Sequence, residues 1–363
     1  MSAAAPFGVY LHVPFCAKRC DYCAFVTFTD RDELMAPVVA AMVRHLARAE
    51  AAGRTRPASS VYLGGGTPSR LPPSSIVSLV RAVQLAPGAE VTVEVNPEDA
   101  TDALVDALLV GGVNRFSFGI QSTAPHVLEA LGRSHGPDDL ARVAEVMQRH
   151  GVERWSVDLI FGARGERDED LAASLAAVLE LPNPPPHISA YALSAEKGTP
   201  LHRDLDRHPD DDVLAERYEL VDETLSAAGY AWEEISSWAK PGHTCAHHEL
   251  YWTGGEYLGV GPGAHGFERP VRYANHATPE RYVAAIEDLE WPVASREELD
   301  EATMAEEALA LELRTSRGVP EALLADDPVI ADLVVRRDGR AVLTRRGRLL
   351  ANEVALRLLP PSR

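Results

Sequence analysis

The residues best suited to chemistry are three cysteines near the start of the chain. Cys16, Cys20 and Cys23 stand at C-x3-C-x2-C spacing, and the remaining cysteine, Cys245, lies far along the sequence. Three thiolates this close together repel one another and oxidise readily, so a metal centre is their natural occupant. Iron–sulfur clusters usually have four cysteine ligands. Three cysteines on a four-iron cluster leave one iron open, and an open position is typical of a reactive centre.

A structural zinc ion is the alternative occupant of this loop. Such a site would be of Cys3His type, with His12 or a distant histidine as the fourth ligand. Zinc ligands usually arrive as two separated pairs, which this sequence does not contain. The spacing therefore favours an iron–sulfur cluster over zinc.

Regular alternation of strands and helices predicts the elements that position this loop. Between residue 9 and about 194, short apolar strands alternate with amphipathic helices, which indicates a parallel sheet with right-handed crossovers. The predicted strands span residues 9–13, 61–63, 91–95, 116–120, 156–161 and 188–193. The predicted helices span residues 36–51, 74–86, 102–109, 137–149 and 168–179. The fold class is α/β, a partial (β/α)6 TIM-like barrel, whose active ends are the C-terminal ends of its strands.

The pattern changes after residue 200. A linker rich in Pro, Asp and Arg precedes a predicted helix over 213–227. Further on, a hairpin is predicted at 334–343, because Asp338-Gly339 is a strong two-residue turn signal, and a last helix is predicted over 346–358. We expect two domains: a barrel core over residues 1–235, and a C-terminal α+β domain, winged-helix-like, over 236–363.

Composition limits the classes of function. The chain has 363 residues, of which 46% are hydrophobic, so it can bury a large core. Its formal net charge of −19 argues against nucleic acid as a partner. It contains no run of apolar residues long enough for a membrane span and no basic start typical of a signal peptide. Clustered thiols need a reducing compartment, so we expect the cytoplasm.

The cysteine loop, with the aromatic residue Tyr22 just before the last cysteine, resembles the signature of radical S-adenosylmethionine (SAM) proteins. In that family SAM chelates the open iron of a [4Fe-4S] cluster, and an electron from the cluster cleaves SAM to a 5′-deoxyadenosyl radical. Residues 64–68, Gly-Gly-Gly-Thr-Pro, directly follow a strand, and glycines let a backbone approach a ligand closely. A plain tight turn is the alternative. The GGGTP form is similar to that of the coproporphyrinogen-oxidase-like branch.

Two carboxylates interrupt otherwise apolar strands. Burying Glu94 and Asp158 in such strands costs free energy unless each carboxylate has a partner. Structural ion pairs with Arg115 or Arg133 are one explanation. The resemblance implies another, a SAM site. It would be formed by Tyr10, Tyr22, Gly65, Gly66, Thr67, Glu94, Gln121, Arg133, Asp158 and Ala192.

Two features resemble the haem chaperones of this branch more than oxygen-independent coproporphyrinogen III oxidase. The oxidase carries a further cysteine two residues past the third ligand, where this chain has Phe25, and a longer segment before its first cysteine. The resemblance implies that [4Fe-4S], SAM and haem are bound and that haem is delivered to respiratory apoproteins, without enzymatic turnover being required. The alternative is the oxidase reaction, SAM-dependent oxidative decarboxylation to protoporphyrinogen IX. A homodimer and peripheral membrane contact are compatible with this interpretation.

One further motif concerns haem. Haem chaperones of this branch carry H-N-x-x-Y-W, and residues 247–252 here read His-His-Glu-Leu-Tyr-Trp. The resemblance implies that His247, His248, Tyr251 and Trp252 contact haem beneath the segment 240–266. The alternative is an aromatic packing loop with incidental histidines.

A basic cluster lies near the end of the chain. Six arginines occur between Arg336 and Arg348 in a very acidic protein. They could contact nucleic acid, haem propionates or an acidic partner, but charge runs of this length usually form a solvated face. No motif for reading nucleic acid accompanies them, so we expect no nucleic-acid binding.

Overall fold

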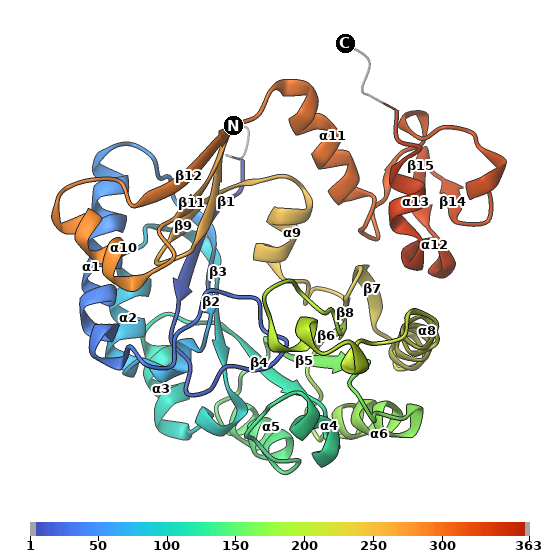
Figure 1. Cartoon of the computed structure of the whole chain (residues 1–363), viewed down its shortest axis with the longest axis horizontal. Helices are drawn as coiled ribbons and strands as arrows, with labels where there is room; N and C mark the ends of the chain where they lie inside the picture. Colours follow the sequence, from blue (N-terminus) through green and yellow to red (C-terminus); the bar gives the residue numbers. More distant parts are fainter. Residues whose placement is uncertain (1–4, 360–363) are drawn as a thin grey trace.

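The fold is built on a 12-stranded sheet, which a computed structural model describes within residues 5–359 (Figure 1). Its centre is six parallel strands that are neighbours in chain order. They are β1 (Phe7–Val13), β2 (Ala58–Gly65), β3 (Leu85–Val95), β4 (Arg115–Gln121), β5 (Trp155–Phe161) and β6 (His187–Ala192). All six predicted barrel strands are therefore present, and the predicted partial (β/α)6 barrel is confirmed.

Helices cover the outer face of the six parallel strands (Figure 1). They are α1 (Met35–Ala51), α2 (Pro73–Arg81), α3 (Asp102–Val110), α4 (Pro125–Ala130), α5 (Asp139–Arg149) and α6 (Asp168–Leu179). On β1, Val9 and Leu11 are fully buried in the hydrophobic core, whereas the alternate residues Tyr10 and His12 are polar. Because side chains alternate along a strand, the first pair faces the helices and the second faces the barrel interior.

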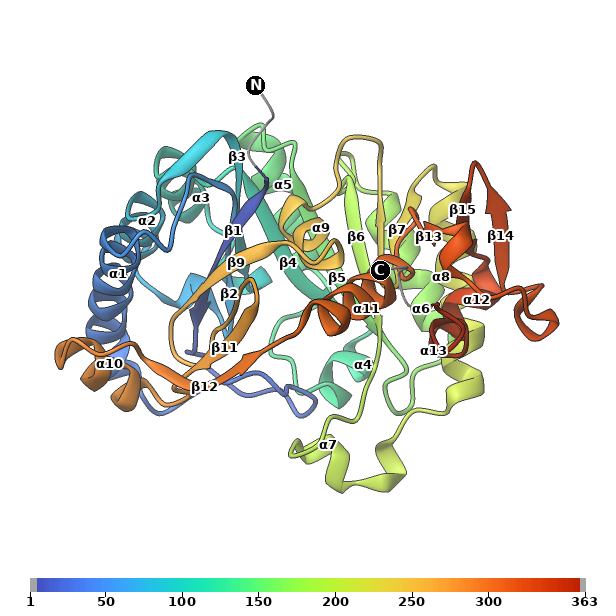
Figure 2. The same ribbon diagram turned by 90° about the horizontal axis from the view of Figure 1, so that it is seen from above.

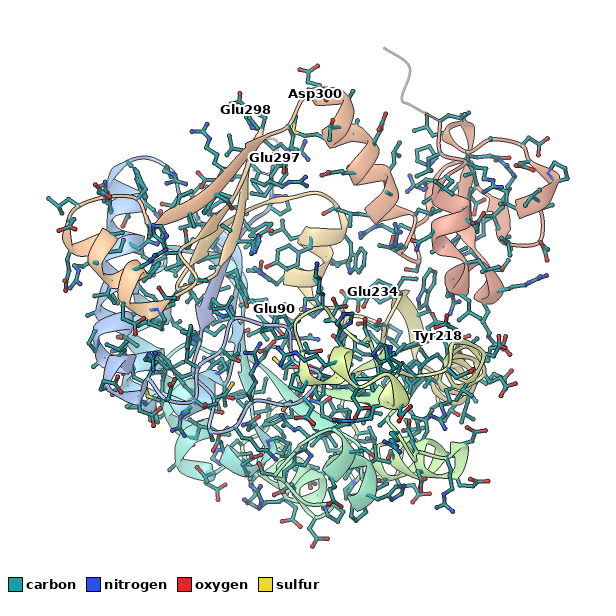
Figure 3. The ribbon with its side chains drawn as sticks, in the orientation of Figure 1. Glu90, Tyr218, Glu234, Glu297, Glu298 and Asp300 are labelled. Atoms are coloured by element: carbon teal, nitrogen blue, oxygen red, sulfur yellow. The ribbon has the colours of Figure 1, made fainter. Side chains whose placement is uncertain are left out.

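The interior of the barrel is unusually polar. Glu90 on β3 is 3% exposed and lies 3.7 Å from the guanidinium of Arg115, which is 1% exposed. Figure 3 shows Glu90 and Glu234 within the body of the molecule, and Glu297 and Asp300 at its rim. Because side chains alternate along a strand, Glu90 lies on the face of β3 opposite the helices.

C-terminal segments complete both edges of this sheet. Strand β9 (Glu256–Val260) pairs in parallel with β1, from Phe7 opposite Glu256 to Leu11 opposite Val260. Beyond it follow β10 (His265–Glu268), β11 (Val271–Asn275) and β12 (Val293–Glu298), all antiparallel. The other edge is extended by β8 (Ser237–Ala239) and β7 (Ala231–Glu234). The domain division at 235/236 falls between these two paired strands and stays a prediction.

The last part of the chain is a small α+β unit. Helix α11 (Glu301–Glu312) leads to the three-stranded sheet β13 (Val319–Pro320), β15 (Arg340–Leu343) and β14 (Val334–Arg337). The predicted hairpin is present, but the predicted helix over 346–358 is two short helices, α12 (Arg345–Leu349) and α13 (Ala351–Ala355). The break falls at Leu350, which has a non-helical φ of −113°. Figures 1 and 2 place this unit on the side of the molecule away from α1.

The arginines of the basic cluster mostly form ion pairs. Arg345 and Arg348 both lie 2.6 Å from the carboxylate of Asp222, which is on α8 (Asp211–Ala227) and 4% exposed in its side chain. Arg340 pairs with Glu312 at 2.5 Å. The contacts of Arg345 and Arg348 attach the C-terminal unit to α8, and that of Arg340 lies within the unit, so most of the cluster is structural rather than a free basic surface. In residues 5–359 no helix has both the length and the apolar character needed to cross a membrane.

Candidate functional site

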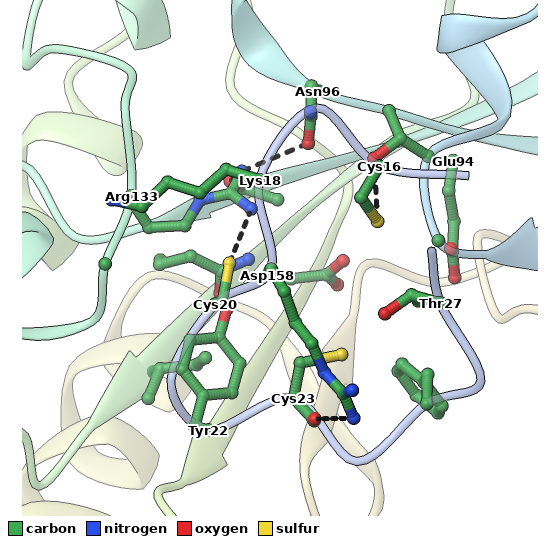
Figure 4. Close-up of a pocket in the computed structure, with 18 of the residues that line it drawn as sticks. Cys16, Lys18, Cys20, Tyr22, Cys23, Thr27, Glu94, Asn96, Arg133 and Asp158 are labelled. Atoms are coloured by element: carbon green, nitrogen blue, oxygen red, sulfur yellow. Dashed lines mark hydrogen bonds between the residues drawn. The ribbon is translucent and has the colours of Figure 1, made fainter. Parts of the chain in front are cut away.

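A cavity of about 610 Å³ opens where the parallel strands end. Its wall includes the cysteine loop and Gly65, Val95, Gln121 and Ala192, which stand at the C-terminal ends of β2, β3, β4 and β6. Figure 4 shows the side chains of the cysteine loop around the same space as Glu94 of β3 and Asp158 of β5. The expected location of the chemistry in a parallel barrel is thus also the location of the cavity.

All three clustered cysteines line this cavity (Figure 4). The hydroxyl of Thr67 donates to Cys16 Sγ at 3.6 Å, and Arg133 Nη1 donates to Cys20 Sγ at 3.7 Å. Burial is the main cause that raises the pKa of Cys16 and of Cys23; the neighbouring thiols Cys23 and Cys20 add to the rise at Cys16, and Cys20 adds to it at Cys23. Metal binding must therefore displace protons from these thiols.

The three thiols are not arranged as the ligands of a single metal ion. Within the described residues, no three His, Cys, Asp or Glu side chains converge tightly enough to hold a single metal ion. A tetrahedral zinc ion, with bonds of about 2.3 Å, needs its sulfur ligands within about 4 Å of one another. The three thiols instead surround a shared cavity. Cys245 does not belong to this group, since its Sγ lies 3.6 Å from Glu90 Oε1 in the barrel interior.

Two glycines let the loop after β2 press against the cysteine loop. The N–H of Gly66 donates to the carbonyl oxygen of Val13 at 2.8 Å. A Cβ atom at Gly66 would lie 2.7 Å from the carbonyl oxygen of Phe15 and 3.0 Å from Cys16 Sγ. Gly65 has a φ of +111°, and a Cβ atom there would lie 2.6 Å from the ring of His12. Both positions therefore require glycine for close approach, not merely for a tight turn.

Glu94 and Asp158 give the cavity two carboxyl groups that resist ionisation. Tyr62 donates its hydroxyl hydrogen to Glu94 Oε1 at 2.8 Å, and the N–H of Gly65 donates to Glu94 Oε2 at 3.2 Å. Burial, and then the charge of Asp158, raise the pKa of Glu94 to about 7. Burial likewise raises the pKa of Asp158, whose Oδ2 accepts from Ser117 at 3.3 Å. Such a pair suits a ligand that brings amino or hydroxyl donors or positive charge.

The two arginines proposed as alternative partners of these carboxylates are engaged elsewhere. Arg115 lies 3.7 Å from Glu90 and donates to the carbonyl oxygen of His243 at 3.1 Å. Arg133 donates to Asn96 Oδ1 at 3.2 Å, as well as to Cys20. The explanation of Glu94 and Asp158 as structural ion pairs with these arginines is therefore wrong.

Gln121 shows two features of a ligand-contacting residue. Its φ of +61° is left-handed, which is rare for a residue other than glycine and costs energy. Its Oε1 atom is buried and has no hydrogen-bond partner among the described residues. An unsatisfied acceptor in a cavity wall is available to a ligand donor.

Nine of the ten residues predicted for SAM line the cavity. They are Tyr22, Gly65, Gly66, Thr67, Glu94, Gln121, Arg133, Asp158 and Ala192. Tyr10 lies below them, and its hydroxyl oxygen is 2.9 Å from His12 Nδ1. Contact of these residues with SAM stays a prediction. Sequence reasoning missed Ser117 of the wall, although strand register pairs Ser117 with Glu94.

The four residues predicted for haem lie together on α9 (Ala246–Trp252), outside the cavity wall. His247 is 0% exposed, and both ring nitrogens have partners: Nδ1 lies 2.9 Å from Ser60 Oγ, and Nε2 lies 2.8 Å from the hydroxyl of Tyr251. His248 and Trp252 are half-buried. The alternative of a packing segment thus describes His247 in this conformation, and a haem role for the four residues stays a prediction.

Comparison with known proteins agrees with this architecture. The family model "Radical SAM superfamily" matches residues 10–178. The "Heme chaperone HemW" of Mycobacterium tuberculosis (strain ATCC 25618 / H37Rv) is 42% identical over 376 residues, covering 98% of this chain and 95% of the relative. The "Heme chaperone HemW" of Escherichia coli (strain K12) is 36% identical, covering 72% of this chain and 70% of the relative. The Bos taurus "Radical S-adenosyl methionine domain-containing protein 1, mitochondrial" is 34% identical, covering 86% and 74%.

A solved structure has the same fold over nearly the whole chain. The coproporphyrinogen III oxidase (HemN) of Escherichia coli superposes with a TM-score of 0.84 at 19% identity, covering 97% of this chain and 89% of that one. The six-stranded partial barrel and the three-cysteine loop at its mouth define a radical SAM protein. Within that superfamily, the chain belongs to the HemW family.

Proposed function

We propose that the protein is a cytoplasmic haem chaperone that binds a [4Fe-4S] cluster and SAM in the cavity and delivers haem to respiratory apoproteins. One observation carries the proposal: three thiols and two carboxyl groups with raised pKa values line a single cavity at the strand ends. The names of the full-length relatives support the haem part. A homodimer and peripheral membrane contact remain compatible with it.

The donor set fits the cofactors. Cys16, Cys20 and Cys23 would hold the cluster, because all three line one cavity. The side-chain donors to Cys16 and Cys20, at 3.6 and 3.7 Å, are weak and would not compete with a metal. When bound, the cluster supplies an open iron for chelation by SAM and a source of one electron. Glu94 would accept from the SAM amino group, and the backbone of Gly65 would allow its approach. Arg133, which donates to Cys20, would balance the negative charge of the thiolates.

Phe25 supports the chaperone over the oxidase. It lines the cavity and is 63% exposed, in the position where the oxidase carries a further cysteine. An exposed phenyl ring at the cavity rim offers apolar contact to a flat ring system but no ligand or reducing group. The oxidase reaction is the alternative outcome of the test.

The test is anaerobic reconstitution with iron and sulfide, followed by titration with haem and by assays for porphyrin products and 5′-deoxyadenosine. Wild-type protein is expected to bind about four iron atoms per chain and to bind haem without forming protoporphyrinogen IX. Serine at Cys16, Cys20 or Cys23 is expected to lower bound iron strongly. Cys245→Ser is the matched control, because its thiol lies outside the cavity. Formation of protoporphyrinogen IX from coproporphyrinogen III would refute the chaperone assignment.

A further inference from the structure

His247 lies at the centre of a group of stacked aromatic rings. Its ring is 5.4 Å from that of Tyr62, with an interplanar angle of 23°, and 6.4 Å from that of Tyr10, with an angle of 28°. Tyr251, one helical turn further along α9, contacts it edge to face at 4.8 Å. Burial lowers the pKa of His247 to about 3, so the ring is neutral and packs as an aromatic group.

Helix α9 packs closely on β1, the strand that leads into the cysteine loop. A Cβ atom at Gly8 of β1 would lie 2.5 Å from Leu250 Cδ2 and 3.0 Å from His247 Cε1. The absence of a side chain at Gly8 thus lets His247 reach the rings of Tyr10 and Tyr62. With Ser60 and Tyr251 holding its two nitrogens, the imidazole has a single orientation.

Two chains of contacts lead from His247 to the cavity. The first chain of contacts runs through Tyr62 to Glu94, because the Tyr62 hydroxyl donates to Glu94 Oε1 at 2.8 Å. The second chain of contacts runs through Tyr10 and His12 to the end of the cysteine loop. The Tyr10 hydroxyl oxygen lies 2.9 Å from His12 Nδ1, and His12 Nε2 lies 2.8 Å from the carbonyl oxygen of Val26, shortly after Cys23.

We infer that His247 is a positioning residue: its stacked ring fixes Tyr62, and thereby orients Glu94 toward SAM, rather than coordinating a metal. The inference rests on the proposed SAM site. Ligation by His247 would require both hydrogen bonds and the stacking to be given up, since no part of its side chain is exposed. Helix α9 therefore contacts the proposed SAM site through the stacked rings of His247 and Tyr62, and not through a metal bound by His247.

The experiment separates the ring from its nitrogens, using the full-length reconstituted protein. His247→Phe keeps a stacking ring but leaves Ser60 and Tyr251 unpartnered; His247→Ala removes the ring as well. We expect His247→Ala to raise the Kd for SAM about tenfold, the amount typical of a misplaced hydrogen bond to a charged group. His247→Phe is expected to keep the SAM Kd within about twofold of wild type, while lowering the melting temperature.

A double-mutant cycle tests the route through Tyr62. Tyr62→Phe removes only the hydroxyl that holds Glu94, and should raise the SAM Kd about as much as His247→Ala. In the Tyr62→Phe background, His247→Ala should then add little, because the route is already broken. Glu249→Gln, on the same helix and outside the residues predicted for haem and SAM, is the control and should leave SAM affinity unchanged.

Other outcomes would overturn the inference. If both His247 variants lose haem binding or shift the haem absorption spectrum while the SAM Kd stays at the wild-type value, His247 is a ligand. If His247→Ala lowers the melting temperature without changing the SAM Kd, its role is only structural. Failure of the wild-type protein to bind SAM would instead refute the proposed function, and is recognised before any variant is measured.

Discussion

The raised pKa of Glu94 predicts that this residue makes the ligand-free protein less stable at high pH. The perturbation is Glu94→Gln, which removes the charge and keeps an oxygen that can accept from Tyr62. In the unfolded chain the carboxyl has a pKa of 4.5, and in the folded protein burial and Asp158 raise the pKa to about 7. Between these values the folded protein holds a proton that the unfolded chain has released. The destabilisation therefore begins above pH 4.5 and is complete above pH 7.

The size of the effect follows from these two values. A pKa raised from 4.5 to about 7 corresponds to at most about 3 kcal/mol at high pH, since each unit is worth about 1.4 kcal/mol. The side chain is half-buried at the cavity wall, so this is an upper limit. About 2 kcal/mol of it develops between roughly pH 5.5 and pH 8. The lost hydrogen bond from Gly65 costs about 1 kcal/mol at every pH and does not alter the slope.

Urea denaturation of wild type and Glu94→Gln, both free of metal and SAM, measures the difference. The stability of the variant relative to wild type should rise by about 2 kcal/mol as the pH increases from about 5.5 to 8. Glu98→Gln, which removes another carboxylate of the same cavity without contacting Tyr62, corrects for general electrostatics. A stability difference between wild type and Glu94→Gln that is constant over this range would show that Glu94 is ionised as readily in the folded protein as in the unfolded chain.

Two further variants test other parts of the structure. Asp222→Asn removes the buried charge that holds two arginines of α12, and should lower the free energy of unfolding by about 3 kcal/mol; limited proteolysis that still leaves the C-terminal unit protected would contradict this. Gly66→Ala would place a Cβ atom 2.7 Å from the backbone oxygen of Phe15, so the iron bound after reconstitution should fall well below the wild-type amount. Gly136→Ala, where a Cβ atom meets nothing within 4 Å, should retain wild-type iron content.

Local patterns predicted the barrel well because its elements are regular. The α6 boundaries, Asp168–Leu179, agree with the prediction residue for residue, since an acidic first turn and an apolar stripe define both the start and the length of the helix. Strands β1 to β5 are longer than predicted by one to several residues at their ends, where glycine and polar residues hide the pattern, and β6 begins and ends one residue earlier than predicted. At β2, for example, Gly64 and Gly65 belong to the strand as well as to the loop.

The parts of the fold and of the site that sequence patterns did not predict depend on contacts between segments far apart in the chain. Nothing local in residues 256–260 indicates a parallel partner, and the pairing of β9 with β1 is made across most of the chain. No helix was predicted around His247, yet the segment is helical, because its side chains find partners on β1 and β2. Tyr10 and His12 both face inward by strand periodicity, but only tertiary structure reveals that Tyr10 lies one layer beneath the cavity.

The position of β1 between β2 and β9 has a consequence for biosynthesis. The strand that leads into the cysteine loop is made first, yet one of its two neighbours is formed by residues 256–260. During synthesis, one edge of β1 therefore stays unpaired until residues 256–260 have been translated. Iron and sulfide delivered before that moment meet an unfinished sheet, so assembly of the proposed cluster should follow the synthesis of β9, and chains terminated before β9 should fail to retain iron.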